Sequence, residues 1–192
     1  FAERDSLVVV IDNDIQNSTF SILMNYEDTV TSGASTTDFA ASGLSSIFED
    51  ADEIVDFYAA FTSGANTTSE SIEEVTVIGA GITRYTFAAV PANFGDYAVG
   101  DLVNISGLAS SDNNGNFVIQ AIGVQSVDVE NPDGVDATLQ SGTGVLSQRR
   151  QIDSYNQLTG GITVSAGFSN TPVLGDDLIV IPSTINNLVD YM

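Results

Sequence analysis

The runs Val75-Thr-Val-Ile78 and Ile82-Thr-Arg-Tyr-Thr-Phe87 decide the fold, because each is typical of a β-strand. Strand-like runs of the same kind continue to the end of the chain, separated by turn-forming residues. Asn114-Gly115 is the strongest turn signal and predicts a type I′ hairpin, which needs positive φ at both central residues. From Ser71 onward we therefore expect β structure throughout. The other runs are Leu102–Ile105, Asn116–Ile119, Val127–Val129, Gly144–Leu146, Ile162–Val164 and Leu178–Ile181.

Many short strands at this spacing predict an antiparallel β-sandwich or small barrel. Before them, Leu7–Ile11 is a continuous apolar run typical of a strand buried on both faces, and Thr19–Met24 indicates a second strand. One segment predicts a helix, because apolar residues recur at three- and four-residue spacing from Leu44 to Phe61. We expect a mainly β fold with this one amphipathic helix packed near the N-terminal strands. The expected division is 1–66, with the first strands and the helix, and a β-sandwich-like region over 67–192.

The composition excludes most chemistry that works near neutral pH. The chain has no His, Cys, Trp or Lys, while 43% of its residues are hydrophobic and suffice for a core. Catalysis would have to depend on carboxylates, hydroxyls and Tyr alone. A glycosidase needs only two carboxylates, but no Asp/Glu pair stands in an apolar setting that would raise a pKa. The sequence therefore predicts a structural or binding protein and not an enzyme.

The charge balance restricts the partners. Against 26 Asp and Glu stand four arginines, which gives a formal net charge of −22. Such a field repels phosphate backbones and anionic lipid, so we expect neither nucleic acid nor membrane as a partner. It favours cations or a high-salt medium, and the alternative interpretation is simple solubility of a surface-displayed protein.

The only basic cluster is Arg149-Arg150. One interpretation is that it pairs with the acidic helix of a neighbouring subunit and sets the register of an assembly. The other is an exposed turn with local ion pairs. The sequence leaves both open.

Two Asx-rich segments carry oxygen ligands of the kind that suit Ca²⁺. The first consists of Asp12 and Asp14 with Asn17, and the second contains Asp112 and Asn114. Neither matches the spacing of an EF-hand loop, and the alternative interpretation of each is an ordinary Asx-rich turn. Calcium is accordingly the one candidate cofactor.

A short pattern occurs twice in the second half of the chain. Phe94–Val103 and Phe168–Ile179 each contain an aromatic residue, a short loop, the pair Gly-Asp and then an apolar strand. Gly permits a tight start to the strand, and the Asp side chain can bond the backbone just before it.

These residues also carry a resemblance. Phe94–Val129, with its Val-Gly-Asp-Leu-Val-Asn-Ile-Ser-Gly start and its Asn-Asn-Gly-Asn-Phe-Val-Ile segment, resembles modules of the structural proteins of tailed phages. Asp5–Asp14 and Gly175–Pro182 look similar to segments of large virion proteins. The resemblance implies a β-rich, non-enzymatic homo-oligomer of a tail, sheath, fibre or capsid decoration. It further implies location in the virion, with other virion proteins as partners. The alternative is a calcium-stabilised adhesin or cell-surface-layer domain.

Overall fold

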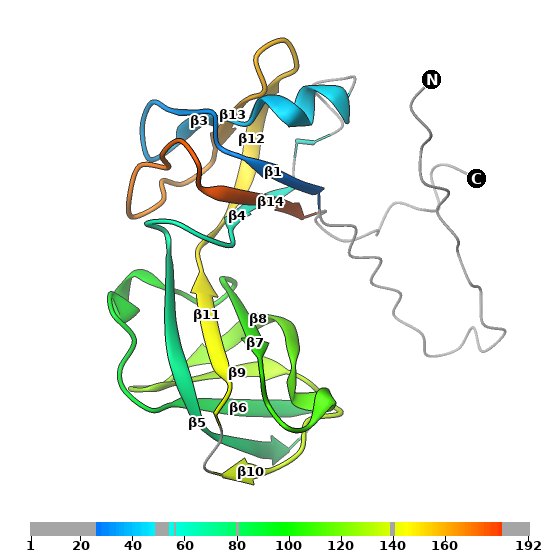
Figure 1. Ribbon diagram of the computed structural model, residues 1–192, viewed down its shortest axis with the longest axis vertical. Helices are drawn as coiled ribbons and strands as arrows, with labels where there is room; N and C mark the ends of the chain where they lie inside the picture. Colours follow the sequence, from blue (N-terminus) through cyan, green and yellow to red (C-terminus); the bar gives the residue numbers. More distant parts are fainter. Residues whose placement is uncertain (1–25, 49–53, 56, 80, 139–140, 182–192) are drawn as a thin grey trace, which may run out of the picture.

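The computed structural model describes residues 26–48, 54–55, 57–79, 81–138 and 141–181, and this part of the chain is mainly β with antiparallel sheets. Two seven-stranded sheets form two units that lie one above the other in Figure 1. The first sheet consists of β1 (Tyr26–Thr29), β14 (Asp177–Ile181), β4 (Tyr58–Phe61), β12 (Arg149–Asn156), β13 (Gly161–Val164), β3 (Asp38–Ala40) and β2 (Ser32–Gly33), in this order. The second consists of β10 (Ala137–Thr138), β5 (Thr67–Gly79), β11 (Thr143–Ser147), β7 (Leu102–Ser106), β8 (Gly115–Ile122), β9 (Ser126–Glu130) and β6 (Ile82–Phe87).

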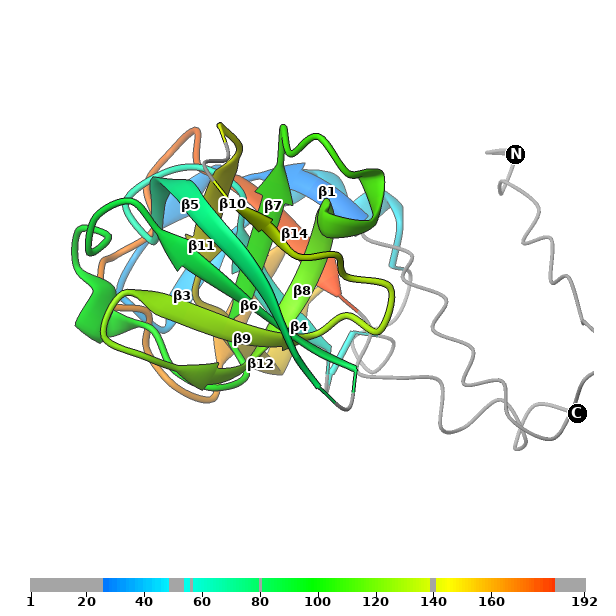
Figure 2. The same ribbon diagram turned by 90° about the horizontal axis from the view of Figure 1, so that it is seen from below.

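The second sheet closes into a six-stranded barrel, which faces the viewer in Figure 2. Closure is possible because β5 is 13 residues long and changes partner along its length. Its first part, Thr67–Ser71, pairs with β11, and the part from Ile72 to Gly79 pairs with β6. The ladder continues through β7, β8 and β9 back to β6, so the six strands have no open side.

The first unit repeats this connectivity. β1 pairs with β14, and β2, three residues further on, pairs with β3. Between them, the amides of Val30 and Thr31 donate to the carbonyls of Asp176 and Ala40. Residues 26–33 thus act as one strand with a different partner at each end, as β5 does. We count β1 and β2 as one strand of the first unit and leave out the short β10 of the second. The circular pairing order is then first, sixth, third, fourth, fifth, second in both units.

The barrel is inserted into the first unit. The chain leaves that unit after β4 and returns to it at β12, and the two ends of the barrel, Thr67 and Ser147, are register partners in adjacent strands. The first crossing lies between β4 and β5, and the expected division of the chain at residue 66 stays a prediction. After the second crossing, β12, β13 and β14 pair with the N-terminal strands and complete the first sheet.

The helix expected from Leu44 to Phe61 is wrong. The described residues of this segment instead contain a 3-10 helix, η1 (Ser42–Ser46), and β4, which pairs with β14 on one side and β12 on the other. A strand in this position is surrounded by protein, and Ala59, Ala60 and Phe61 are fully buried. Consecutive apolar residues of such a strand also satisfy the 3.6-residue period of a helix. The apolar pattern of this segment therefore did not distinguish a buried strand from an amphipathic helix. No described helix is long and apolar enough to cross a membrane.

The strands expected from residue 75 onward are confirmed, since each of the eight runs coincides with a strand. The type I′ turn at Asn114-Gly115 is wrong, because Asn114 is extended at φ −98° and ψ 142°. Its side chain instead closes the wider loop between β7 and β8: Oδ1 accepts from the Leu108 amide, and Nδ2 donates to the carbonyls of Leu108 and Ser110. The loop includes the short helix η4 (Ser111–Asn113). The expected strands at Leu7–Ile11 and Thr19–Met24 lie outside the described residues.

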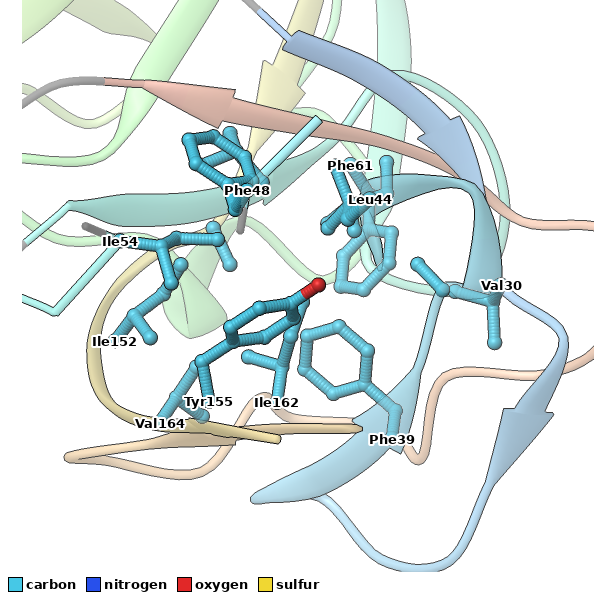
Figure 3. Packing of buried hydrophobic residues seen from close by; sticks show 14 of the residues in the cluster. Val30, Phe39, Leu44, Phe48, Ile54, Phe61, Ile152, Tyr155, Ile162 and Val164 are labelled. Carbon is cyan, nitrogen blue, oxygen red and sulfur yellow. The ribbon is translucent and has the colours of Figure 1, made fainter. Parts of the chain in front are cut away.

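Each unit has its own apolar core, and that of the first contains several aromatic rings packed among aliphatic side chains (Figure 3). The rings of Phe61 and Phe168 meet edge to face with their centroids 4.8 Å apart. Tyr155 lies in the same cluster with its hydroxyl pointing inward (Figure 3). Among the described residues, this hydroxyl is the one buried side-chain group without a hydrogen-bond partner. Burial raises the pKa of Tyr155, because the phenolate would be poorly solvated there.

Tyr155→Phe is therefore expected to stabilise the protein. The substitution removes a buried hydroxyl whose desolvation is not compensated and keeps the ring, so the free energy of unfolding should rise by about 1 kcal/mol. Urea unfolding followed by circular dichroism measures the change. A loss of stability would show instead that the hydroxyl makes a hydrogen bond in solution.

Candidate functional site

Several side chains that make two or more hydrogen bonds gather where the two units join. Asp101 precedes β7 of the barrel, and its Oδ1 accepts from the Arg149 amide and from Nη1 of Arg150, both at 2.8 Å. Its Oδ2 accepts from the Ala98 amide at 2.9 Å. The side chains of Asp101 and Arg150 are only 3% and 17% exposed. The barrel therefore holds the start of β12 through a buried ion pair.

Gln148 connects both units at the same crossing, between β11 and β12. Its Nε2 donates to Ser169 Oγ at 2.6 Å and to the Asp96 carbonyl at 3.3 Å, while its Oε1 accepts from the Ser169 amide at 2.8 Å. Asp96 belongs to η3 (Phe94–Asp96) on the barrel side, and Ser169 to the loop before β14. A side chain that is 1% exposed and uses both ends of its amide fixes the relative position of these loops.

The two arginines differ in their surroundings. The Arg149 guanidinium lies over the Tyr58 ring, 4.2 Å from its centroid, and Arg150 lies 5.6 Å from the centroid of Phe168. Burial lowers the pKa of Arg149, although Tyr58 and Asp101 oppose this effect, and the guanidinium stays charged in any case. Both side chains are therefore engaged within this chain. They begin strand β12 and do not lie in an exposed turn, so the structure differs from the second interpretation of the cluster; Arg150 pairs with Asp101 of the same chain, 49 residues away.

Hydrogen bonds also connect the two units at the first crossing, between β4 and β5. Asn66, 1% exposed, donates from Nδ2 to the Asn170 carbonyl at 3.0 Å and accepts at Oδ1 from the Asn170 amide at 2.9 Å. The Asn170 side chain donates to the Ala65 carbonyl. Ser147 Oγ, at the end of β11, bonds both the amide and the carbonyl of Phe61. We use the name junction clasp for these contacts together with those of Asp101, Arg150 and Gln148.

The repeated Gly-Asp pattern has the same conformation in both copies. Gly100 and Gly175 both have φ 96°, a value that glycine adopts without strain. In the second copy, Asp176 Oδ2 accepts from the amide three residues earlier, Val173, just as Asp101 does from Ala98. The expected bond from Asp to the backbone is thus confirmed, and it reaches back along the chain. Among the residues that the structure describes, only the first copy adds a cation, Arg150.

A cleft of about 300 Å³ lies beside the junction clasp. One wall is formed by β1, β4 and β14 of the first unit, and the other by β7, β8 and β11 of the barrel. Its surface is mixed, with apolar side chains, hydroxyls, amides and one carboxylate. The lining residues are Glu27, Phe61, Thr62, Leu102, Asn104, Asn116, Val145, Ser147 and Ile179.

The structure describes the residues of one of the two predicted calcium sites. Asp12, Asp14 and Asn17 lie outside the described residues. Asp112 and Asn114 share the β7–β8 loop, but the Asn114 amide oxygen is engaged by the Leu108 amide, and Asp112 Oδ1 accepts from its neighbour Ser111 at 3.3 Å. In the part of the chain that the structure describes, no three acidic side chains are grouped so that they could hold a metal ion.

Sequence reasoning found Asp101 through the repeated pattern, but it did not find Gln148 or Asn66. Each is a single amide residue in polar surroundings, so no local pattern distinguishes it. Comparison of the chain with protein-family models and with curated protein sequences finds no match.

Proposed function

We propose that this chain is a non-enzymatic structural protein of the virion of a tailed phage or a similar virus. Copies of it would self-assemble through subunit contacts, together with other virion proteins, to build or stabilise the tail or the capsid. The similarity of its strand-and-turn segments to phage structural modules supports this proposal. The observation that carries it is the junction clasp.

The junction clasp supports a mechanical role for a physical reason. A buried ion pair is weak evidence for stability, because its desolvation cost offsets the attraction between the charges. Here Asp101, Arg150 and Gln148 hold two separately closed barrels in one orientation. The two residues of the ion pair, Asp101 and Arg150, are 49 residues apart along the chain. If the internal geometry of a subunit is fixed, every copy meets its neighbour at the same angle. A closed symmetric assembly requires such equal angles between neighbouring subunits.

The barrels also restrict where subunits can meet. Because closed barrels have few open strand edges, we expect contacts through apolar side chains at loop ends. Val99 and Leu174, each just before a Gly-Asp pair, are 63% and 76% exposed, and Leu158 is 92% exposed. The other contact elements that we propose, Leu7–Ile11 and 185–192, lie outside the described residues.

Self-assembly is tested by electron microscopy and light scattering of the purified chain over a range of concentrations. Rings, tubes or trimers of uniform size are expected, and alanine at both Val99 and Leu174 should reduce them. The matched control is Val124→Ala, which removes another exposed apolar side chain at a barrel turn. A chain that stays monomeric at every concentration, alone and with its neighbouring virion proteins, would contradict the proposal.

Calcium should stabilise this protein no more than magnesium does at equal ionic strength. Both salts are expected to raise the melting temperature, because they screen repulsion among 26 acidic residues balanced by four arginines. In the described β7–β8 loop, the Asn114 side-chain oxygen already accepts a hydrogen bond from the Leu108 amide. Thermal melts in each salt, before and after EDTA, measure the difference. A rise specific to calcium would favour the adhesin or surface-layer alternative, since ion binding stabilises the native state by mass action.

A further inference from the structure

The cleft beside the junction clasp has polar groups that the described residues leave without partners. The Glu27 carboxylate has no cation among them, and its side chain is exposed on β1. Asn104 Nδ2 donates to Asn116 Oδ1 at 2.6 Å, so Oδ1 of Asn104 and Nδ2 of Asn116 still have capacity to bond. These amides lie beside the apolar side chains of Leu102 and Ile179. The surface therefore suits an extended segment with one cation and several apolar residues.

The chain contains such a segment. Three of its four arginines are engaged internally: Arg84 forms a bidentate pair with Asp128, Arg150 pairs with Asp101, and Arg149 lies over Tyr58. Arg4 is the fourth. It is followed by the apolar run Leu7–Ile11.

The N-terminal segment also joins the described structure directly beside the cleft. It enters β1 at Tyr26, next to Glu27 in the cleft wall. The residues between Ile11 and Tyr26 can span up to roughly 45 Å when extended, which suffices to fold back or to reach a neighbouring copy.

We propose that this cleft binds the N-terminal segment of the chain, with Arg4 paired to Glu27 and Leu7–Ile11 against the apolar wall. A cleft of about 300 Å³ is at the lower end of the usual size of binding pockets and admits a few side chains. The inference does not depend on the virion role. Docking within one copy would remove Leu7–Ile11 from the proposed subunit contacts and leave the exposed loop-end contacts, whereas docking between copies would make Leu7–Ile11 one of the subunit contacts.

Disulfide trapping tests this proposal directly, because the chain has no Cys. Ser6→Cys is combined with Thr62→Cys in the cleft, where the exposed side chain, which the proposed binding does not use, allows the change without loss of fold. Under mild oxidation the pair should cross-link at least about tenfold faster than a control pair, because docking raises the effective concentration. The control joins Ser6→Cys to Val124→Cys, which lies beyond the far end of β8, roughly 20 Å from Asn116.

Charge reversal makes the test specific. Glu27→Arg should lower the cross-linking rate to that of the control, and adding Arg4→Glu should restore it. A cross-link within one chain indicates docking in the same copy, and a cross-linked dimer indicates docking between copies; both support the proposal. A rate equal to the control, or one that Glu27→Arg leaves unchanged, would overturn it. Circular dichroism of each variant confirms that the fold is kept.

Discussion

Asp101→Ala is expected to destabilise the protein by about 3–5 kcal/mol, because it leaves the Arg150 guanidinium in the junction without its counter-charge. The same change removes the acceptor for the amides of Arg149 and Ala98. Urea unfolding followed by circular dichroism measures the loss. The size of the effect reflects the removal of one partner from a buried pair, and not the net contribution of the pair to stability.

Two further variants give this prediction its controls. Asp128→Ala removes the partner of Arg84, whose side chain is 44% exposed, so it should cost only about 0–1 kcal/mol. Arg150→Met in the Asp101→Ala background removes the unpaired charge and should restore part of the stability. If Asp101→Ala costs no more than Asp128→Ala, the junction clasp does not hold the units together as we infer.

Phe61→Ala is expected to lower the free energy of unfolding by about 3–5 kcal/mol, the usual range for a large buried aromatic side chain. Phe61 is fully buried, and its ring contacts those of Phe168 and Phe39. It also ends β4, immediately before the first crossing into the barrel. Denaturant unfolding measures the loss. Leu158→Ala, in the same unit but at a side chain that is 92% exposed, should change stability by less than about 0.5 kcal/mol.

The shape of the unfolding curve is informative as well. Because the junction clasp ties the barrel to the first unit, Phe61→Ala should shift one common transition recorded by all probes. Two separate transitions, with only the first shifted, would mean that the barrel folds independently of the unit that surrounds it.

The strands of the barrel were readable from local sequence, while β12 was not. In Arg149–Asn156 only Ile152 and Tyr155 are buried, and a bulge between Ile152 and Ser154 breaks the alternation of the strand. Apolar residues three apart do not give the two-residue period of a strand. The helix prediction for the segment ending in β4 was wrong for the opposite reason. The buried strand is apolar at consecutive positions, so it satisfies a helical period as well.

Short-range patterns along the chain thus account for the β class, for most strands of the barrel and for the paired Gly-Asp turns, because each depends on neighbours a few residues away. The insertion of one barrel into another, and the meeting of Asp101 with Arg150 or of Asn66 with Asn170, depend on contacts 49 and 104 residues apart. Such contacts follow from strand register and from closure of the barrels, which specify partners only when the whole chain is folded. A composition without His, Cys, Trp or Lys led us to expect a protein of binding and packing, whereas the junction clasp and its cleft became visible only in three dimensions.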